Sequence, residues 1–507
     1  MNADGGEDCF VLVVGSGPSA LTLSYLLSGH EPVYNGVHSD PLVHSLLQKT
    51  PSLYDAILHN ISLHRHILRT QTGVAAPVNT LLDSLAAPGI HFDPAGNKSL
   101  IRYRHRPAVP HLVVDSSFQP GGQWTAKDFP SQTLSYAQML SLPGYSFADF
   151  MLETYGLPFD AYTRPPREDV AAYYALYPSK VGISGSIKGN STVLSLRRRD
   201  ASSFTAIIQN NDTGHLSIVA PRIVVLASGV FTHQLPPDPI LIKAMSCQRV
   251  SKSTNEDGPV LVIGSGFSAA DAVLSVPKHQ KIIHIYKWDP LSRPSPLRAC
   301  NRETYPEYAS LYRHMRRSAS VTTASSRSSC VTFDPAGLCG RYEGLPNSVV
   351  VDTPSVDTIR IQSSLGGIVE RKVSQLQTYI GRIGVISYLS LSLRDEIGIG
   401  ADQIWASKHS FRIRILERLD RWVTLRKHKK GWRLEEALYD LDTPIKDDDS
   451  CEVISDYSAT HGLELADGVF AIGSLVGDSL VRYALGGCVT VAGNIFERYQ
   501  TVISQRE

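Results

Sequence analysis

The stretch FVLVVGSGPSALTLSYLLSG, residues 10–29, predicts a strand, a glycine turn and a helix in immediate succession. FVLVV is a continuous apolar run rich in β-branched residues, which is typical of a strand buried on both faces of a parallel sheet. The turn has the form G-x-G-x-x-G/A: Gly15 permits a tight turn, Gly17 lets the backbone approach a pyrophosphate, and Ala20 lets helix and strand pack closely. Gly29 is a natural end for the helix.

The same order of elements recurs in the middle of the chain. The strand VLVI (260–263) is followed by GSGFSA and a helical segment, and the strand KIIHIY (281–286) comes next. Gly264, Gly266 and Ala269 take the three positions of the turn. One such turn is weak evidence, because glycine turns also arise by chance. Two copies, each between a buried strand and a helix, predict two dinucleotide-binding folds.

The residue after the second strand of such a fold selects the nucleotide. An acid about twenty residues after the first glycine would bind the adenosine ribose. In the first copy this region reads PVYNG; Asn35 still bonds a hydroxyl, and Asp40 is a further candidate. In the second copy the strand runs into Lys287, a cation that suits a 2′-phosphate, with a solvated lysine as the alternative. The second site is therefore expected to prefer NADPH.

A third motif, PGGQW, has the composition expected beside a planar ligand. Gly121 and Gly122 let the backbone lie flat against a ring, and Gln123 and Trp124 follow, the indole providing an apolar wall. A simple turn with a core tryptophan is the structural alternative. The motif indicates a flavin contact.

A fourth motif, VFAIGSLVGDSLVRYALGG, lies near the end of the chain. A buried strand ends at Gly473, and Asp478 precedes a helix expected to begin at about residue 479. The N-terminus of that helix would face an electron-rich ring carbonyl. As an alternative, Asp478 is simply the N-cap of the helix.

Composition limits the class of protein. The 507 residues are 42% hydrophobic and 19% charged, as in ordinary globular chains. The 49 Lys and Arg residues nearly balance the 48 Asp and Glu residues, so no net charge attracts nucleic acid. No apolar stretch approaches the roughly 18 residues of a membrane helix, and the N-terminus has no targeting signal. We therefore expect a cytoplasmic protein without a nucleic-acid partner or transmembrane segment.

The cysteine and histidine patterns predict no metal site. The seven cysteines are scattered, with no C-x-x-C pair, which indicates a reducing compartment and disfavours a dithiol flavoenzyme. The closest histidine pair, His64 and His66, has no nearby cysteine or acid in the sequence. The motifs G-x-S-x-G, H-E-x-x-H and the P-loop are absent too, so no catalytic residue is identified.

The order of these motifs predicts a first domain over residues 1–245, a second over 246–445, and a return to the first over 446–507. A charged insertion is expected at about 398–449. Within it, 405–449 combines a mixed-charge helix with an acidic patch. A solvated surface is the simpler interpretation, and a protein-binding surface is the alternative.

Taken together, these segments resemble one family. PGGQW, SQTLSYAQMLSLPGYSFADF, PPREDVAAYY, GPVLVIGSGFSAADAV, YPEYASLY and VFAIGSLVGDSLVRYALGG are similar to the oxidative-stress-induced growth inhibitor family. That family belongs to the broader class of flavin-containing and N-hydroxylating monooxygenases. YPEY and GDSLVRYALGG are the most specific parts of the likeness.

The resemblance implies an α/β fold of two Rossmann-like dinucleotide-binding domains, with the FAD domain interrupted by the NADPH domain. It also assigns roles to the motif residues. FAD would contact Gly15, Gly17, Ala20, Gly121, Gly122, Trp124, Gly473 and Asp478, and NADPH would contact Gly264, Gly266 and Ala269.

The implied activity is a monooxygenation. NADPH would reduce FAD, and O₂ would give a C4a-hydroperoxyflavin that oxygenates a small soft nucleophile, with a role in growth, differentiation or oxidative-stress regulation. A catalytically weak regulatory scaffold and an NADPH oxidase that releases hydrogen peroxide are the alternatives. The chain departs from the family in having Lys287 and Trp288 where relatives often carry an arginine cluster, and it lacks the full FxGxxxHxxxW fingerprint of ketone oxygenation.

Overall fold

The computed structural model divides the chain into two compact units. It describes residues 9–70, 76–90, 93, 98–125, 133–156, 158, 160–250, 257–292, 294–300, 302, 305–320, 334–355, 357–399, 404–405, 463–478 and 480–505. The first unit comprises Met1–His233 and Ile383–Glu507, and the second comprises Gln234–Arg382. The second unit therefore interrupts the first, as the resemblance implies. Among the described residues, no helix is long and apolar enough to cross a membrane.

The boundaries differ from the expected residues 245 and 445. The chain returns to the first unit at Ile383 because the segment that follows packs into that unit's core, where Leu389 and Leu393 are buried. Ser390 N also donates to the carbonyl oxygen of Leu196 over 2.9 Å. The charged insertion at 398–449 lies outside the described residues, apart from 398–399 and the short strand β19 (Ile404–Trp405).

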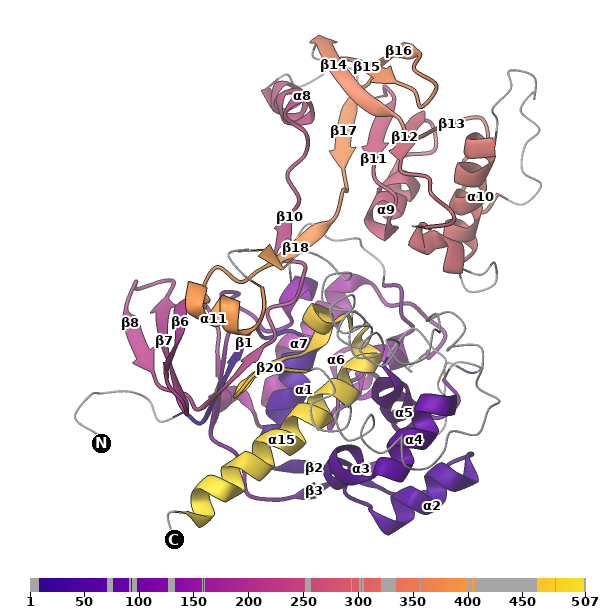
Figure 1. Cartoon of the computed structure of the whole chain (residues 1–507). Helices are drawn as coiled ribbons and strands as arrows, with labels where there is room; N and C mark the ends of the chain where they lie inside the picture. The colour runs from indigo at the N-terminus through magenta and orange to yellow at the C-terminus, as the bar shows by residue number, and fades with distance from the viewer. Residues whose placement is uncertain are drawn as a thin grey trace, which may run out of the picture. The chain divides into compact units, whose positions relative to one another are not determined.

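The first unit is built on a six-stranded sheet of order β20-β21-β9-β1-β4-β5 (Figure 1). Its strands are β1 (Val11–Val14), β4 (His111–Val114), β5 (Ile187–Lys188), β9 (Ile223–Leu226), β20 (Glu464–Ala466) and β21 (Val469–Ala471). β1 is parallel to both β4 and β9, and β21 is parallel to β9. Every residue of β1 and β9 is buried, as a strand covered on both faces requires.

Helices cover one face of this sheet. α1 (Pro18–Leu27) packs along α15 (Ala484–Ser504), the long yellow helix of Figure 1. A helical layer joins them through contacts of α3 and α5 with α15. The chain segment that forms this layer contains β2 (His30–Tyr34), α2 (Pro41–Lys49), α3 (Leu53–His59), α4 (Ile61–Thr70), α5 (Pro77–Ala86) and β3 (Ile101–His105). β2 and β3 form a separate antiparallel ribbon, so this layer is an insertion between α1 and β4.

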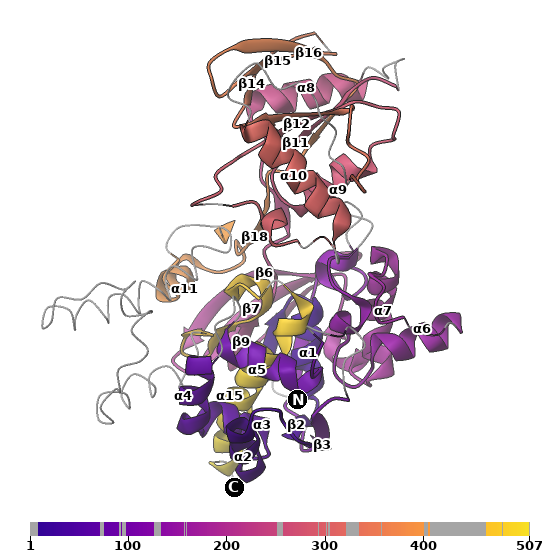
Figure 2. The ribbon, with the colours of Figure 1, turned by 90° about the vertical axis from the view of Figure 1, so that its right-hand side faces the viewer.

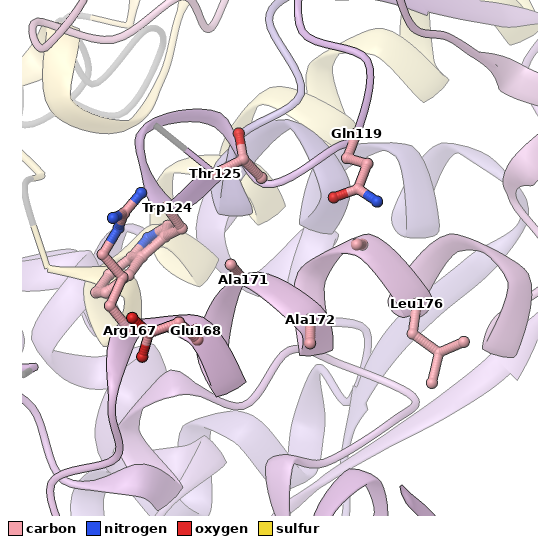
Figure 3. Close-up of a pocket in the computed structure, with 9 residues that line it drawn as sticks. Gln119, Trp124, Thr125, Arg167, Glu168, Ala171, Ala172 and Leu176 are labelled. Carbon is pink, nitrogen blue, oxygen red and sulfur yellow. The ribbon is translucent and has the colours of Figure 1, made fainter. Parts of the chain in front are cut away.

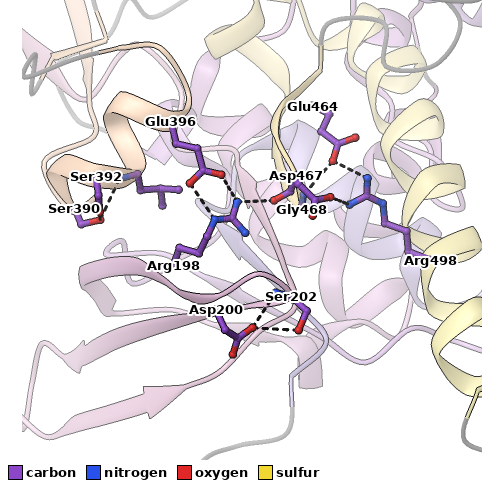
Figure 4. Close-up of polar contacts among 11 residues, drawn as sticks. Arg198, Asp200, Ser202, Ser390, Ser392, Glu396, Glu464, Asp467, Gly468 and Arg498 are labelled. Carbon is purple, nitrogen blue, oxygen red and sulfur yellow. Dashed lines mark hydrogen bonds and ion pairs between the residues drawn. The ribbon is translucent and has the colours of Figure 1, made fainter.

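An antiparallel meander covers the other face, formed by β6 (Ser191–Asp200), β7 (Ser203–Asn210) and β8 (Leu216–Val219). The short helix α11 (Leu391–Glu396) packs beside it. Arg198 donates to both carboxylate oxygens of Glu396, at 2.9 and 2.5 Å, and to the carbonyl oxygen of Asp467 at 2.7 Å (Figure 4). One guanidinium thus joins the segments on either side of residues 400–462.

A tyrosine-rich cluster anchors α6 (Phe147–Tyr155) and α7 (Arg167–Lys180), which Figure 2 shows close together. Three buried tyrosines of α7 donate to backbone carbonyls of the loop before α6. Tyr173 reaches Tyr145 at 2.5 Å, Tyr174 reaches Leu140 at 3.0 Å, and Tyr177 reaches Pro143 at 2.5 Å. These bonds satisfy the tyrosine hydroxyls inside the core, because a buried hydroxyl needs a partner.

The second unit has a four-stranded parallel sheet of order β13-β12-β11-β17. Its strands are β11 (Val260–Ile263), β12 (Ile282–Tyr286), β13 (Tyr342–Pro346) and β17 (Gln375–Thr378). The helices are α8 (Pro239–Val250), α9 (Phe267–Ser275) and α10 (Pro306–Ser320). An antiparallel sheet of β14 (Val349–Ser355), β15 (Thr358–Gln362) and β16 (Ile368–Lys372) completes its core. β10 (His233–Gln234) and β18 (Arg382–Val385) lie where the chain changes unit.

Candidate cofactor-binding sites

The first glycine turn joins β1 to α1 at the carboxyl edge of the sheet. Gly15 has φ 107°, and a Cβ there would lie 2.5 Å from the carbonyl oxygen of Ala227, so only glycine fits. At Gly17 a Cβ would meet no atom of the described chain within 4 Å. Gly17 is also the N-cap of α1 and has no side chain to satisfy the first N–H groups of the helix. The turn thus presents an open helix N-terminus to an anion, while Ala20 is fully buried against the sheet.

The PGGQW segment lies on this turn. Gly121 N donates to the carbonyl oxygen of Ser16 over 2.9 Å, and a Cβ on Gly122 would lie 3.0 Å from the Cα of Gly17. The 3₁₀ turn η1 (Gly122–Thr125) contains Gln123 and Trp124, and the indole meets Tyr174 edge-on at 6.0 Å. The two expected flavin-contacting glycines and the first turn are therefore together.

A carboxylate that sequence reasoning missed lies beside the same turn. Asp115 follows β4, the parallel neighbour of β1. Its Oδ2 accepts from the backbone N and the Oγ of Ser16, both at 2.7 Å, and its Oδ1 accepts from Ser117 N at 2.7 Å. A carboxylate offers about four lone-pair sites, so one acceptor position is left. In the sequence, the run HLVVD, a buried strand that ends in an acid just before PGGQW, could have identified this carboxylate.

Asn35 and Asp40, the two residues expected to bind the adenosine ribose, lie directly after β2 and directly before α2. Asn35 follows β2 on the separate β2–β3 ribbon, where its backbone N donates to the carbonyl oxygen of Leu100 over 2.8 Å. Asp40 is the N-cap of α2 and accepts from Leu42 N at 2.9 Å. Its other oxygen contacts His66 Nε2 at 2.6 Å, which gives His66 an acidic partner that the sequence did not indicate. The hydrogen bond to His66 lowers the pKa of Asp40.

The fourth motif closes the other side of the turn. A Cβ on Gly473, at φ 69°, would lie 2.6 Å from Ser19 Oγ of α1. The neighbouring Ser474 Oγ accepts from Val230 N over 3.1 Å, which ties the end of β21 to the end of β9. Gly473, Ser474 and the segment after β9 thus reach the first turn together.

The final helix begins later than expected. α15 begins at Ala484, after the 3₁₀ turn η6 (Val481–Tyr483), and its N-cap is Tyr483. Asp478 is therefore not the N-cap, and the alternative expectation was wrong. Its Oδ2 lies 3.6 Å from the position of a Cβ on Gly487, beside the first turn of the helix. A carboxylate there is favoured by the helix dipole.

A cavity of about 680 Å³ opens next to Trp124 (Figure 3). The floor is the outer face of α7, and Figure 3 shows Arg167 beside Trp124 at one end. The lining residues are Gln119, Trp124, Thr125, Arg167, Glu168, Ala171, Ala172, Ala175 and Leu176. The alanines and the indole give this hollow its apolar surface, Arg167 and Glu168 add charged groups, and it shares Trp124 with the loop on the first turn.

The second glycine turn repeats the backbone geometry of the first. Gly264 has φ 151°, and a Cβ there would lie 2.4 Å from the carbonyl oxygen of Tyr379. Gly266 is the N-cap of α9, and a Cβ on it would meet no described atom within 4 Å. Ala269 is buried. This turn therefore presents a second open helix N-terminus.

A buried histidine holds the second turn. His284 of β12 contacts the carbonyl oxygen of Gly264 through Nε2 at 2.8 Å and the hydroxyl of Tyr342 through Nδ1 at 2.9 Å. Because a carbonyl only accepts, Nε2 carries the proton and Nδ1 accepts from the tyrosine. Burial lowers the pKa of His284 to about 4, so the ring is neutral at physiological pH.

Lys287 lies beside the same turn. Its backbone N donates to Ser265 Oγ over 2.9 Å, and Ser295 Oγ donates to the carbonyl oxygen of Ser265 over 2.7 Å. The Lys287 side chain is exposed at the carboxyl end of β12. It therefore occupies the position whose side chain contacts the adenosine ribose in such folds.

One group among the described residues has the composition of a metal site: His314, Asp334 and Cys339, with candidate ligand atoms within 4.8 Å of one another. Cys339 is disulfide-bonded, so it offers no thiolate. The oxygens of Asp334 already accept from Ser310 Oγ and from the backbone N of Leu338 and Cys339. The group therefore supports no metal site, and the scattered cysteines did not predict its disulfide.

Relatives of known name match the chain over its whole length. It is 26% identical to oxidative stress-induced growth inhibitor 1 of Mus musculus, covering 98% of this chain and 97% of the relative. It is 24% identical to oxidative stress-induced growth inhibitor 2 of Homo sapiens, covering 95% and 92%. No family model matches. The resemblance in the motifs is thus confirmed.

Among solved structures, the chain is similar to a flavin-containing monooxygenase from Stenotrophomonas maltophilia at 14% identity and a TM-score of 0.45, covering 97% of this chain and 99% of that one. It is similar to ornithine hydroxylase from Pseudomonas aeruginosa at 11% identity and a TM-score of 0.46, with the same coverage. The two sheets, one parallel and one parallel except for its edge strand β20, with their glycine turns are the Rossmann-like α/β fold that was expected.

Proposed function

We propose that this relative of the growth inhibitors is an FAD- and NADPH-dependent monooxygenase that acts with O₂ on a small molecule. The observation that carries the proposal is the meeting of four chain segments at the first glycine turn. The ends of β4, β9 and β21 and the PGGQW loop all contact it. A dinucleotide that also carries a planar ring system fits such a site, since it needs a phosphate cradle, a ribose acceptor and a flat glycine wall.

The residues present fit FAD. Gly15, Gly17 and Ala20 shape the turn that would hold the pyrophosphate, and Asp115 replaces Asn35 as the proposed ribose acceptor. The open side of Gly17 supports this assignment, because a ligand phosphate needs that space. Gly121, Gly122, Gln123 and Trp124 would lie along the flavin, with Gly473 and Asp478 on the side of α15.

Bound FAD would supply the redox chemistry, with NADPH as reductant and O₂ as oxidant. The chain would supply position and electrostatics. The N-terminus of α15 would direct partial positive charge towards the ring carbonyls. Trp124 and the alanine face of α7 would provide apolar surface beside the ring, in a hollow that is open to solvent. No acid or base of the chain needs to enter the reaction for this role.

The second unit would bind NADPH. Gly264, Gly266 and Ala269 would hold its pyrophosphate, and Lys287 would face the 2′-phosphate. The hydrogen bond from Lys287 N to Ser265 Oγ supports this assignment by holding the cation next to the turn. The names of the relatives support a role in growth control under oxidative stress. A cytoplasmic location and a protein partner at 405–449 remain predictions.

The deciding experiment is an absorbance spectrum of the purified full-length protein before and after anaerobic NADPH. We expect flavin bands that bleach with NADPH and return with air. Flavin-loaded protein whose bands do not bleach would overturn the proposal. If all oxidised NADPH appears as hydrogen peroxide, whatever amine or thiol is added, the chain is an oxidase instead.

A further inference from the structure

The residue after Lys287 is a tryptophan whose backbone is held from both sides. Trp288 N donates to Asn347 Oδ1 over 2.7 Å, and Asn347 Nδ2 donates back to the carbonyl oxygen of Trp288 over 3.0 Å. Asn347 has φ 51°, a conformation that few non-glycine residues adopt, and its own N donates to the carbonyl oxygen of Tyr286 over 2.8 Å. A single asparagine thus fixes the chain where β12 ends.

The indole itself has aromatic support. Tyr312 of α10 lies with its ring centroid 5.5 Å from that of Trp288, at an interplanar angle of 35°, and Tyr286 meets the indole edge-on at 6.1 Å. Trp288 is nevertheless only half-buried. A large apolar ring that is rigidly supported and partly open to solvent is typical of a stacking surface for a ligand.

Its position indicates which ligand. Lys287 N bonds Ser265 of the glycine turn, so Trp288 follows the residue that faces the ribose in such folds. Adenine is attached to that ribose, and its flat face stacks on aromatic side chains. Arg316 is exposed one helical turn after Tyr312, on the same face of α10, and adds a second cation near the aromatic pair.

We infer that Trp288 stacks on the adenine of NADPH at the second site, while Lys287 and Arg316 flank the 2′-phosphate. This inference rests on the proposed function, and it separates two roles. The indole recognises adenine whether or not the phosphate is present, and the two cations recognise the phosphate alone.

The test measures the binding of 2′,5′-ADP and 5′-AMP to the full-length protein by calorimetry and by tryptophan fluorescence. We expect Trp288→Ala to weaken both ligands by about 5- to 100-fold, and Trp288→Phe to keep both within about threefold while losing the fluorescence quench. Lys287→Gln and Arg316→Gln should weaken 2′,5′-ADP only. Lys281→Gln, just before the opposite end of β12 and also exposed, is the matched control and should change neither ligand.

The outcomes separate the inference from the proposed function. If the wild type binds neither ligand nor NADP⁺, the NADPH site of the proposed function fails. If the wild type binds but Trp288→Ala binds 5′-AMP equally well, the stacking role is overturned. Should Trp288→Ala not fold, Trp288→Phe decides: retained binding without the quench supports stacking, and an unchanged quench excludes it.

Discussion

The two glycine turns share one backbone geometry and differ in the groups that hold them. In both, the first glycine lies against a carbonyl oxygen that would meet a Cβ at 2.5 or 2.4 Å, and the second faces open space. The first turn is held by the Asp115 carboxylate, whereas the second is held by the neutral His284 and by the backbone of Lys287. The steric part of the motif is therefore common to both turns, and under the proposed function the charged side chains beside them determine which nucleotide each turn binds.

The largest effect should come from breaking that shared backbone. Gly15→Ala places a methyl group 2.5 Å from the carbonyl oxygen of Ala227 at a positive φ, so we expect loss of FAD and of much of the folded protein. Gly17→Ala has room for its methyl group and should leave the fold intact while excluding the phosphate. Flavin content and circular dichroism of the two variants, measured together, check this. Equal loss of circular dichroism in both variants would contradict the view that Gly15 is needed for the fold and Gly17 for the phosphate.

The group that holds the second turn, His284, should make stability depend on pH. Burial lowers the pKa of His284 to about 4, below its usual 6.5, so the unfolded chain binds the extra proton more readily. The stability from this group is complete above pH 6.5 and is lost as the pH falls towards 4, on the order of 3 kcal/mol.

Urea unfolding of wild type and His284→Gln between pH 4 and 8 measures this difference. The glutamine amide still donates to Gly264 but does not titrate, so the variant should lose less stability on acidification than the wild type. Parallel pH profiles would show that His284 does not carry the dependence. Comparison with the wild type is needed because burial also lowers the pKa of other histidines, including His64 and His111.

Asp115, the proposed ribose acceptor of the first turn, gives the next effect. Asp115→Asn keeps the shape of the side chain but removes the charge and turns an amide NH2 towards the backbone N of Ser16 or Ser117. We therefore expect FAD affinity to fall at least about 30-fold, as for a lost charged hydrogen bond. Asn35→Ala, on the β2–β3 ribbon, should leave affinity unchanged. Titration of apoprotein with FAD compares the two. A larger effect at Asn35 than at Asp115 would restore the expectation from sequence spacing.

The neighbours of β1 show which features the sequence predicts and which it does not. Buried strands and glycine turns are local patterns, so β1, β11 and the helices that follow both turns could be predicted from the residues, although the helices begin at Pro18 and Phe267, within the turn motifs. Neighbours in a sheet are set by hydrogen bonding. The helical layer between α1 and β4 moves the true neighbour of β1 far along the chain, beyond the spacing rule that selected Asn35.

The later start of α15 has a similar origin. A 3₁₀ turn at Val481–Tyr483 separates Asp478 from Ala484, and the apolar pattern of the sequence does not distinguish that turn from the first turn of a helix. Arg482 within it forms a buried ion pair with Asp83 of α5, a contact between segments distant in sequence. Tertiary contacts of this kind leave no local signal.

The smallest effect should come from replacing Lys287, the side chain whose charge distinguishes the second turn from the first. Lys287→Gln removes the cation but keeps its backbone bond to Ser265, so the second turn should stay intact and NADPH should bind about tenfold more weakly. NADH, which has no 2′-phosphate, should be unaffected, and Lys281→Gln should behave as wild type towards both. The ratio of the two nucleotide affinities is the measurement. An equal loss for NADPH and NADH would mean that Lys287 supports the turn without reading the phosphate, and the difference between the two sites would then rest on Asp115 alone.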